Sequence, residues 1–523
     1  MDTVVYVKSS KQALYINEKD NVVMAIEPIK KGEIADAGTL KIEALEDIPR
    51  GHKIAARDIS AGTPLIKYGK VVGRINKDVK RGAWVHCHNV DDITEELEVK
   101  AQEELMERLS GVVAEDIKPY RQAPKLSRDT IKAYRRKDGS MGVRNNVIII
   151  SIIHCANNAA QKIAQATGAP CITQEGGCLE FSDRLYHIVN SFICAGTHPN
   201  TYGVLVLSQG CQQVNPEWII EPIRKSGREV YHLCLSKDGG FYSVVNKGIE
   251  FIKKMRQSAA QEKRVPCPVS ELVLSVHTGG SDWTSMLASN PVCGMALDIH
   301  ESVGGAIVAT AGRGNQIDRC GSEDTLRRMI DIGNRFRADC IIRNGQGLSK
   351  VNPTPGNKAG GLTTLEEKNC GTHQAHSHCL IRGFMELGER PKGQGFWAID
   401  QCHGNNDSFD CTGAAMASTH FILFTTGLGS LVGNACANVI KICANKETMK
   451  AMPECADFDA SVYLLGEKNL EETAVALYEC MLDCAEGKLT KSELIGDFSW
   501  TIPHAKSLNG DYPAAPPSCP ILE

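Results

Sequence analysis

Three histidines in the first ninety residues form one group that could carry out chemistry. His52 follows a glycine, and His86 and His88 stand on either side of Cys87. Alternate residues of a strand point to the same face, so we expect His86 and His88 to share one. Converging imidazoles can bind a divalent metal or transfer protons near neutral pH. The alternative is that these are strand histidines satisfied by solvent or by neighbouring groups.

A second group lies in the loop from Asn352 to Lys368, which contains two prolines and a Gly-Gly pair. Proline fixes φ and glycine lets the backbone approach a ligand closely, so we expect a rigid loop until about residue 362. A helix should follow, capped by Thr363 or Thr364, with acidic residues in its first turn. Amide groups, Lys358 and a helix N-terminus suit a small anion such as a carboxylate. The alternative is a tight structural loop.

The chain has 21 cysteines and no Cys-x-x-Cys pair. Because the N-terminus shows no secretory pattern, we expect reduced thiols and a cytoplasmic protein. Cys155, Cys178 and Cys211 each follow a predicted strand, and three thiolates could hold iron or an iron–sulfur cluster. They could equally act as small hydrophobic side chains. His373, His376 and His378 form a further cluster dense enough to suggest a metal.

Composition limits the classes of function. The chain has 523 residues, 42% hydrophobic and 23% charged, with a net charge of −4. No basic surface is implied, which argues against a nucleic-acid partner. No apolar run reaches about 18 residues, which argues against a membrane span. The expected partner is a small molecule.

The pattern of elements predicts an α/β protein with several domains. Short apolar runs broken by glycine indicate a small β domain over residues 1–90, followed by a linker helix and arm over 91–127. Apolar strands then alternate with amphipathic helices over 128–265 and again over 266–523, which is typical of largely parallel sheets. Ligands bind beyond the carboxyl ends of such strands. Six polar or glycine-rich strand exits therefore favour a small polar ligand.

Ordered motifs along most of the chain resemble one known family, the altronate and galactarate dehydratases. They are Gly51-His52-Lys53, Val85-His-Cys-His-Asn89, Tyr134 to Asn145, Cys155, Gly177-Cys178, His198-Pro-Asn200, Gly210-Cys211, Gly279-Gly-Ser-Asp282, Asn290-Pro291, Pro355 to Gly361 and Phe424 to Gly429. The resemblance implies a fused N-terminal SAF domain of the β-clip type. It also implies dehydration of a sugar acid to a 2-keto-3-deoxy acid, assisted by a divalent metal, Fe²⁺ first and Mn²⁺ second.

Roles can then be assigned to residues of this chain as the resemblance implies them. His52, His86 and His88 would serve as metal ligands or acid–base groups, and Lys358 with Asn357 would clamp the carboxylate. Further candidates for catalysis or substrate binding are Asp282, Ser281, Arg144, Asn145, Thr426 and Arg313. Cys155, Cys178 and Cys211 are candidate ligands of iron or of an iron–sulfur cluster.

The sequence departs from the family pattern at several positions. Thr278 stands where the family usually has Cys, and Gln212 where it usually has Glu. Two alternatives to a hydro-lyase therefore stay open. One is a sulfo-lyase, as in the family's sulfolactate branch, with Arg313 contacting a sulfonate; the other is a non-catalytic sugar-acid binder. From the chain's size and Pro-rich end we expect a homo-oligomer, a dimer first.

Overall fold

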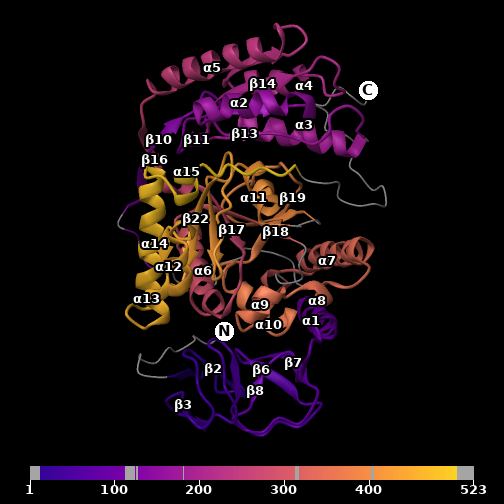
Figure 1. Cartoon of the computed structure of the whole chain (residues 1–523), viewed down its shortest axis with the longest axis vertical. Coiled ribbons are helices and arrows are strands. Elements are labelled where there is room, and N and C mark those ends of the chain that lie inside the picture. The colour runs from indigo at the N-terminus through magenta and orange to yellow at the C-terminus, as the bar shows by residue number, and fades with distance from the viewer. Residues whose placement is uncertain are drawn as a thin grey trace.

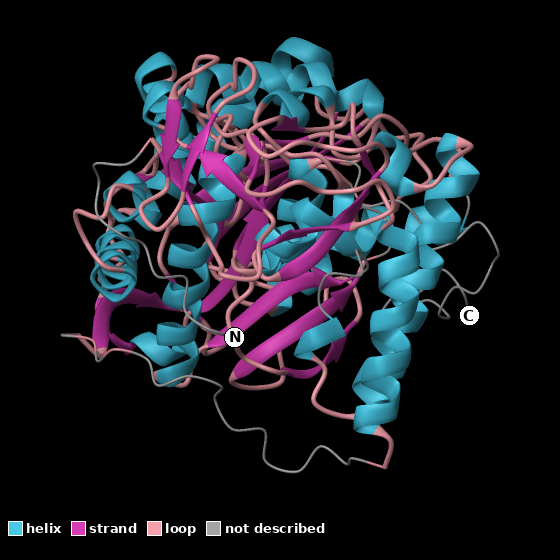
Figure 2. Cartoon of the chain, turned by 90° about the horizontal axis from the view of Figure 1, so that it is seen from below, coloured by secondary structure: helices cyan, strands magenta, loops and turns pink. Residues whose placement is uncertain are grey.

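The computed structural model describes residues 12–111, 124, 126, 128–180, 182–311, 317–401 and 406–502. Figure 1 shows three bodies stacked along the long axis: an N-terminal β domain at one end, an α/β domain at the other and a larger α/β domain between them. Seen from below, long strands run through the middle of the molecule with helices on both sides (Figure 2). The predicted α/β class with a small N-terminal β domain is confirmed.

The N-terminal domain consists of short antiparallel strands. Its elements are β1 (Ala13–Leu14), β2 (Val22–Ala25), β3 (Ile34–Asp36), β4 (Lys41–Glu43), β5 (Lys53–Ala55), β6 (Pro64–Lys67), β7 (Lys70–Ile75), β8 (Trp84–Val85) and β9 (Val90–Asp91), followed by α1 (Thr94–Leu109). Tight turns separate them, with Gly32, Gly62 and Gly82 at φ of 83°, 84° and 91°. Only glycine adopts this conformation without steric cost, so these residues decide where the strands stop.

The second domain is a parallel sheet in the order β13-β12-β14-β15. Its elements are β12 (Asn146–Ser151), α2 (Asn157–Thr167), β13 (Cys171–Ile172), α3 (Ser182–Thr197), β14 (Thr201–Ser208), α4 (Glu217–Lys225), β15 (Glu229–Cys234) and α5 (Gly240–Ala259). Alternate residues of β12 are buried on opposite faces: Ile148 and Ile150 pack toward α3 and α4, Val147 and Ile149 toward α2 and α5. Burial on both faces explains the continuous apolar run.

A three-stranded antiparallel sheet lies at the junction of the second domain with the third. It contains β10 (Thr130–Arg135), β11 (Met141–Gly142) and β16 (Val265–Pro268), in the order β11-β10-β16. Because β10 precedes the second domain and β16 follows it, their pairing closes the base of that domain.

The third domain contains a seven-stranded parallel sheet in the order β19-β20-β18-β17-β21-β22-β23. Its strands are β17 (Val273–Thr278), β18 (Ala306–Ala311), β19 (Ile381–Met385), β20 (Gly395–Asp400), β21 (Phe421–Thr426), β22 (Asn438–Cys443) and β23 (Phe458–Asp459). Its helices are α6 (Asn290–Ser302), α7 (Glu323–Asn344), α8 (Leu348–Val351), α9 (Pro355–Ala359), α10 (Leu365–His373), α11 (Asp407–Met416), α12 (Lys446–Ala451), α13 (Ser461–Leu464), α14 (Leu470–Ala485) and α15 (Lys491–Ile495). Helices α6, α7 and α14 cover one face and α11 packs on the other.

Two parts of the sequence prediction meet different outcomes here. Thr364 caps α10 and its first turn holds Glu366 and Glu367, as expected. The preceding loop is not irregular throughout, because residues 355–359 form the one-turn helix α9, capped by Thr354. Most of the arm before Pro124 and the Pro-rich end lie outside the described residues. No helix in the described part of the chain is long and apolar enough to cross a membrane.

Candidate functional site

A buried ion cluster joins the N-terminal domain to α10. The Lys53 ammonium lies 3.0 Å from the Glu367 carboxylate and the Lys67 ammonium 2.6 Å from it, and all three side chains are 0% exposed. Thr363 donates its backbone N–H to the same carboxylate at 2.9 Å. The positive N-terminal end of α10 also favours this anion. The cluster therefore fixes α10 against strands β5 and β6.

His52, next to Lys53 in the chain, is held in one neutral tautomer. The indole N–H of Trp84 donates to His52 Nδ1 at 3.2 Å, so Nδ1 acts as acceptor. Nε2 must then carry the proton, which it donates to the carbonyl of Ala359 at 3.2 Å. Burial lowers the pKa of this imidazole and keeps it neutral. His52 thereby links the N-terminal domain to α9.

His86 is a second neutral imidazole beside the first. Its ring centroid lies 4.6 Å from that of His52, and it stacks on Trp84 with an interplanar angle of 8°. Burial, followed by the charge of Lys53, lowers its pKa to about 3. Its Nδ1 is buried and has no hydrogen-bond partner in the described part of the chain. We refer to His52, Trp84 and His86 as the histidine cluster.

The expectation that His86 and His88 share a strand face is wrong. Strand β8 ends at Val85, and the following residues form a turn closed by Asn89, whose side chain accepts the His86 backbone N–H at 2.9 Å. His88 is exposed and packs on Trp84 with ring centroids 5.1 Å apart. Both imidazoles contact the indole of Trp84, His86 as a stacked ring and His88 as a tilted one.

Cys87 and Lys358 complete the surroundings of the cluster. The Cys87 thiol lies 3.8 Å from His86 Nε2 and 3.6 Å from the Thr363 carbonyl. Burial raises the pKa of this thiol, and the ammonium of Lys358 opposes the shift. Lys358 therefore places a positive charge near the cluster. We predicted no role for Cys87 from the sequence, although it stands between two histidines.

The other polar residues predicted near this site hold its loops together. Asn357 donates to the Ser281 carbonyl at 2.8 Å, and Ser281 is only 2% exposed. Asp282 accepts from Thr284, the Ser285 backbone and Asn445, and burial raises its pKa. Thr426 Oγ1 accepts the Gly429 N–H at 3.0 Å. The loop after β17 thus meets α9, and backbone bonds from Gly427 and Leu428 to the Gly280 carbonyl join it to the loop after β21.

Two predicted substrate-binding residues lie elsewhere. The guanidinium of Arg144 pairs with Glu493 at 2.7 Å and donates to the carbonyls of Cys484 and Lys488. Asn145 bonds Arg136 and the Ala259 carbonyl. The contacts of Arg144 hold the second domain to the third, whereas those of Asn145 lie within the second domain. Neither residue joins the histidine cluster. Arg313 lies outside the described residues.

The structure also places the predicted sulfur ligands. Cys155, Cys178 and Cys211 are exposed on three loops at the carboxyl edge of the second domain's sheet. Backbone bonds join these loops, from His154 N to Gly176 O at 2.9 Å and from Gln213 N to Gly177 O at 2.8 Å. The backbone brings the loops together, and an iron–sulfur cluster on them stays a prediction.

The predicted histidine and cysteine ligands are not arranged to bind a metal ion. Within the described residues, no three His, Cys, Asp or Glu side chains are positioned to hold one. Both nitrogens of His52 are engaged in hydrogen bonds. The cluster of His373, His376 and His378 does not form a metal site either. His373 pairs with Asp318 and His378 with Asp298.

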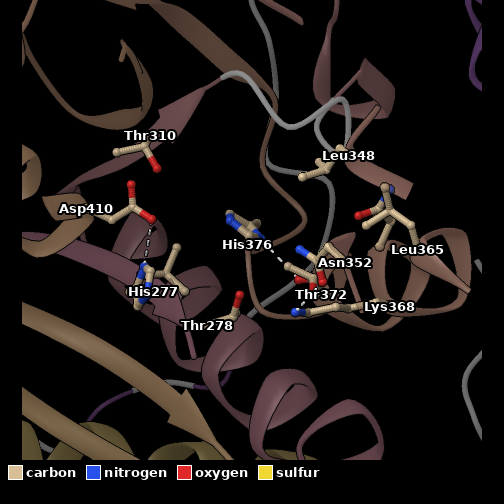
Figure 3. Close-up of a pocket in the computed structure, with 12 residues that line it drawn as sticks. His277, Thr278, Thr310, Leu348, Asn352, Leu365, Lys368, Thr372, His376 and Asp410 are labelled. Carbon is tan, nitrogen blue, oxygen red and sulfur yellow. Dashed lines mark hydrogen bonds and ion pairs between the residues drawn. The ribbon is translucent and has the colours of Figure 1, made fainter. Parts of the chain in front are cut away.

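A second polar site opens where the strands of the central sheet end (Figure 3). We call it the strand-exit pocket; it is lined by Val276, His277, Thr278, Thr310, Leu348, Asn352, Leu365, Lys368, Asn369, Thr372, His376 and Asp410. Of the six predicted strand exits, the one after β17 lines this pocket through His277 and Thr278, whereas those after β12, β13 and β14 belong to the sheet of the second domain. Its charged residues were not predicted, because Lys368 and Asp410 lie on helices.

Three family descriptions match consecutive parts of this chain. Residues 11–93 match the altronate/galactarate dehydratase SAF domain, residues 133–260 the second domain of D-galactarate dehydratase/altronate hydrolase, and residues 269–507 the C-terminal domain of D-galactarate/altronate dehydratase. Each match covers one of the three bodies of the structure.

Individual relatives are similar over long stretches. Altronate dehydratase of Bacillus subtilis is 30% identical over 502 residues, covering 92% of this chain and 97% of that protein. The beta subunit of (2R)-sulfolactate sulfo-lyase from Chromohalobacter salexigens is 32% identical over 381 residues, 70% of this chain and 95% of the subunit. The alpha subunit of that protein is 34% identical over 74 residues, 13% of this chain and 79% of the subunit.

Proposed function

Because this chain belongs to the altronate/galactarate dehydratase family, whose dehydratases are carbon–oxygen lyases, we propose that it removes water from a sugar acid or related polyhydroxy carboxylate. The product would be a 2-keto-3-deoxy acid. The observation that carries the proposal is the meeting of two neutral imidazoles, His52 and His86, next to α9, where Lys358 precedes the carbonyl of Ala359 that His52 contacts. These groups come from two domains that the buried ion cluster holds together.

The chemistry requires such groups. Removing the proton next to a carboxylate places a second negative charge on that carboxylate, so a fixed cation must stabilise the developing enediolate. Lys358, at the end of α9, supplies a positive charge at this place. A base must take the proton, and an acid must protonate the departing hydroxyl.

His86 is the candidate base. It is neutral, and its Nδ1 is engaged by no group in the described residues. The arrival of a carboxylate raises the pKa of a nearby imidazole and makes it a stronger base. His52 is bonded through both nitrogens and would orient α9 and the indole rather than leave its place. His88 would contact the outer end of a long substrate.

A divalent metal, Fe²⁺ first and Mn²⁺ second, stays a prediction, since the described side chains do not form its site.

Turnover on a panel of acids tests the proposal. The protein is purified without oxygen, its metal content is measured, and sugar acids and sulfonated hydroxy acids are assayed for 2-keto acid and for sulfite. We expect keto acid from a sugar acid and its loss in His52→Ala. His232→Ala, which removes an exposed imidazole of the second domain, should keep full turnover. No keto acid from any substrate would overturn the proposal.

A second candidate, a sulfo-lyase, is favoured by one observation. Both subunits of the sulfolactate sulfo-lyase are similar to parts of this single chain, and the beta subunit is 32% identical. The two reactions share proton removal and differ in the leaving group. Sulfite released in proportion to product would establish the second candidate in place of the first.

A further inference from the structure

Two cysteines lie one turn apart near the end of α14, away from the groups assigned to the proposed reaction. Cys480 is partly exposed to solvent, and Cys484, four residues later, is buried. Residues four apart on a helix lie on the same face, so the two thiols are neighbours. The Cys484 thiol donates a hydrogen bond to the sulfur of Cys480. The pair therefore presents one sulfur to solvent and supports it with a second thiol.

Lys488 supplies a positive charge to the exposed sulfur. Its Nζ lies 3.9 Å from Cys480 Sγ. The hydrogen bond from Cys484, followed by the charge of Lys488, lowers the pKa of Cys480 below its ordinary value, although partial burial opposes the shift. A thiolate, rather than a thiol, is the nucleophilic form of cysteine, and a nearby lysine favours it.

The segment that contains the two supporting residues is fixed by the second domain. Arg144 Nη1 donates to the Cys484 carbonyl at 2.7 Å, and Arg144 Nη2 donates to the Lys488 carbonyl at 2.8 Å. The same guanidinium pairs with Glu493 of α15. The backbone on which the second thiol and the ammonium depend is thus held in place beside Cys480.

Two carboxylates near the sulfur act against the thiolate, and both are engaged by other groups. The charges of Asp457 and Asp483 raise the pKa of Cys480. Asp483 lies 2.9 Å from the guanidinium of Arg128. Asp457 accepts the backbone N–H groups of Lys441 and Lys491 at 2.8 and 2.7 Å. These contacts hold the carboxylates in interactions of their own.

We propose that Cys480 is a site of oxidative modification, activated by Lys488, at which a peroxide and then a small external thiol react. The thiolate attacks one oxygen of hydrogen peroxide, so that an S–O bond forms, the O–O bond breaks and hydroxide leaves with the electron pair. The sulfur is oxidised to a sulfenic acid and the peroxide is reduced. The external thiol then displaces the hydroxyl group as water and forms an S–S bond. The site needs no turnover at the histidine cluster, so the proposal is independent of the proposed function.

Helix geometry explains why an external thiol, and not Cys484, completes the reaction. The Cβ atoms of residues four apart on a helix are about 5–6 Å from each other, whereas a disulfide requires about 3.8 Å. A bond between Cys480 and Cys484 would require the last turn of α14 to open. The hydrogen bonds from Arg144 to the carbonyls of Cys484 and Lys488 oppose that opening.

Peptide mass spectrometry of the full-length protein tests the proposal. The reduced protein is treated with hydrogen peroxide at pH 7, in one sample together with dimedone, which traps sulfenic acids. In a second sample catalase removes the peroxide and free cysteine is then added. We expect dimedone on Cys480 in the first sample and one cysteinyl group on Cys480 in the second. An unmodified Cys480, or a disulfide between Cys480 and Cys484, would overturn the proposal.

A matched pair of lysine variants tests the activating charge. Lys488→Met should slow the labelling of Cys480 by dimedone several-fold, because less of the sulfur is then present as thiolate at pH 7. Lys468→Met removes an exposed lysine just before α14 and should leave the rate unchanged. Both lysines are exposed, so neither change removes a buried contact. Equal rates in the two variants would overturn the role of Lys488.

Discussion

At the scale of single residues, the environment of an imidazole decides its chemistry more than its position in the sequence. Trp84 and Ala359 use both nitrogens of His52, while burial leaves His86 neutral with Nδ1 unpaired among the described residues. The sequence could name these histidines as candidates. It could not separate their roles, because the partners of His52, which are Trp84 and Ala359, lie 32 and 307 positions away from it in the chain.

The pH profile of turnover tests the neutral state of His86. Its pKa lies at about 3 instead of 6.5, so the base keeps its proton-accepting form well below neutral pH. The acid limb of kcat/KM should therefore fall below pH 6, measured on a sugar acid that supports turnover. A limb centred near 6.5 that His86→Gln abolishes would contradict this environment.

The buried carboxylate of Glu367 should contribute strongly to the stability of the folded protein. Glu367→Gln removes the anion between two buried ammonium groups, and breaking a buried pair costs about 3–5 kcal/mol. The free energy of unfolding, measured with urea, should fall by this amount at pH 7. Asp47→Asn removes the partner of Lys30 in an exposed pair and should have little effect.

The same residue predicts a pH dependence of stability. The two lysines hold the pKa of Glu367 well below its ordinary value of 4.5. A lowered carboxyl pKa stabilises the folded state above the unfolded pKa, and this contribution is lost as the pH falls through the folded value. Between pH 7 and pH 3 the unaltered protein should therefore lose more stability than Glu367→Gln. Parallel curves for the two proteins would contradict the assignment.

At the scale of elements, strands of the parallel sheets were predictable because burial on both faces demands continuous apolar runs. Residues 202–208 and 421–425 were expected as strands, and β14 and β21 cover them. The helix after Thr364 was predictable from its cap. The end of β8 was not predictable from the sequence. The turn that follows it is closed by the side chain of Asn89 and contains no glycine or proline that would have signalled it.

A close approach of two glycines at the domain junction gives a prediction about elements. Gly361 has φ of 93°, and a Cβ there would lie 2.1 Å from the Gly51 carbonyl oxygen. Gly361→Ala should push α10 away from β5, lower the melting temperature by several degrees and remove turnover. Gly62→Ala is the control: Gly62 has a φ of 84°, but a Cβ there would have no atom within 4 Å. This variant therefore has the backbone strain without the clash. Equal effects of the two changes would show that the clash does not matter.

At the scale of the whole molecule, long-range contacts assemble the site, and these were beyond prediction from one sequence. Lys53 and Glu367 are 314 positions apart, and Arg337 of α7 pairs with Glu98 of α1. The motifs indicated that both stretches matter, but not that they touch. The expected dimer stays a prediction, to be measured by light scattering.

These contacts predict that the N-terminal domain can bind as a separate chain. A cut after Gly111 leaves the buried ion cluster and the contact of α1 with α7 as non-covalent links. Residues 1–111 and 112–523, produced together with a tag on the shorter piece, should purify as a complex, and Glu367→Gln should weaken it. Separate elution of the two unaltered pieces at micromolar concentration would contradict the interface.

The central claim is proton removal and loss of water at the histidine cluster, and ¹H NMR of the reaction in D₂O tests it most directly. Elimination followed by ketonisation requires a product that carries one solvent deuteron at C3. We predict a 2-keto-3-deoxy acid with that label from a sugar acid, and no product from His86→Ala. A product without the label, or full turnover in His86→Ala, would contradict the claim.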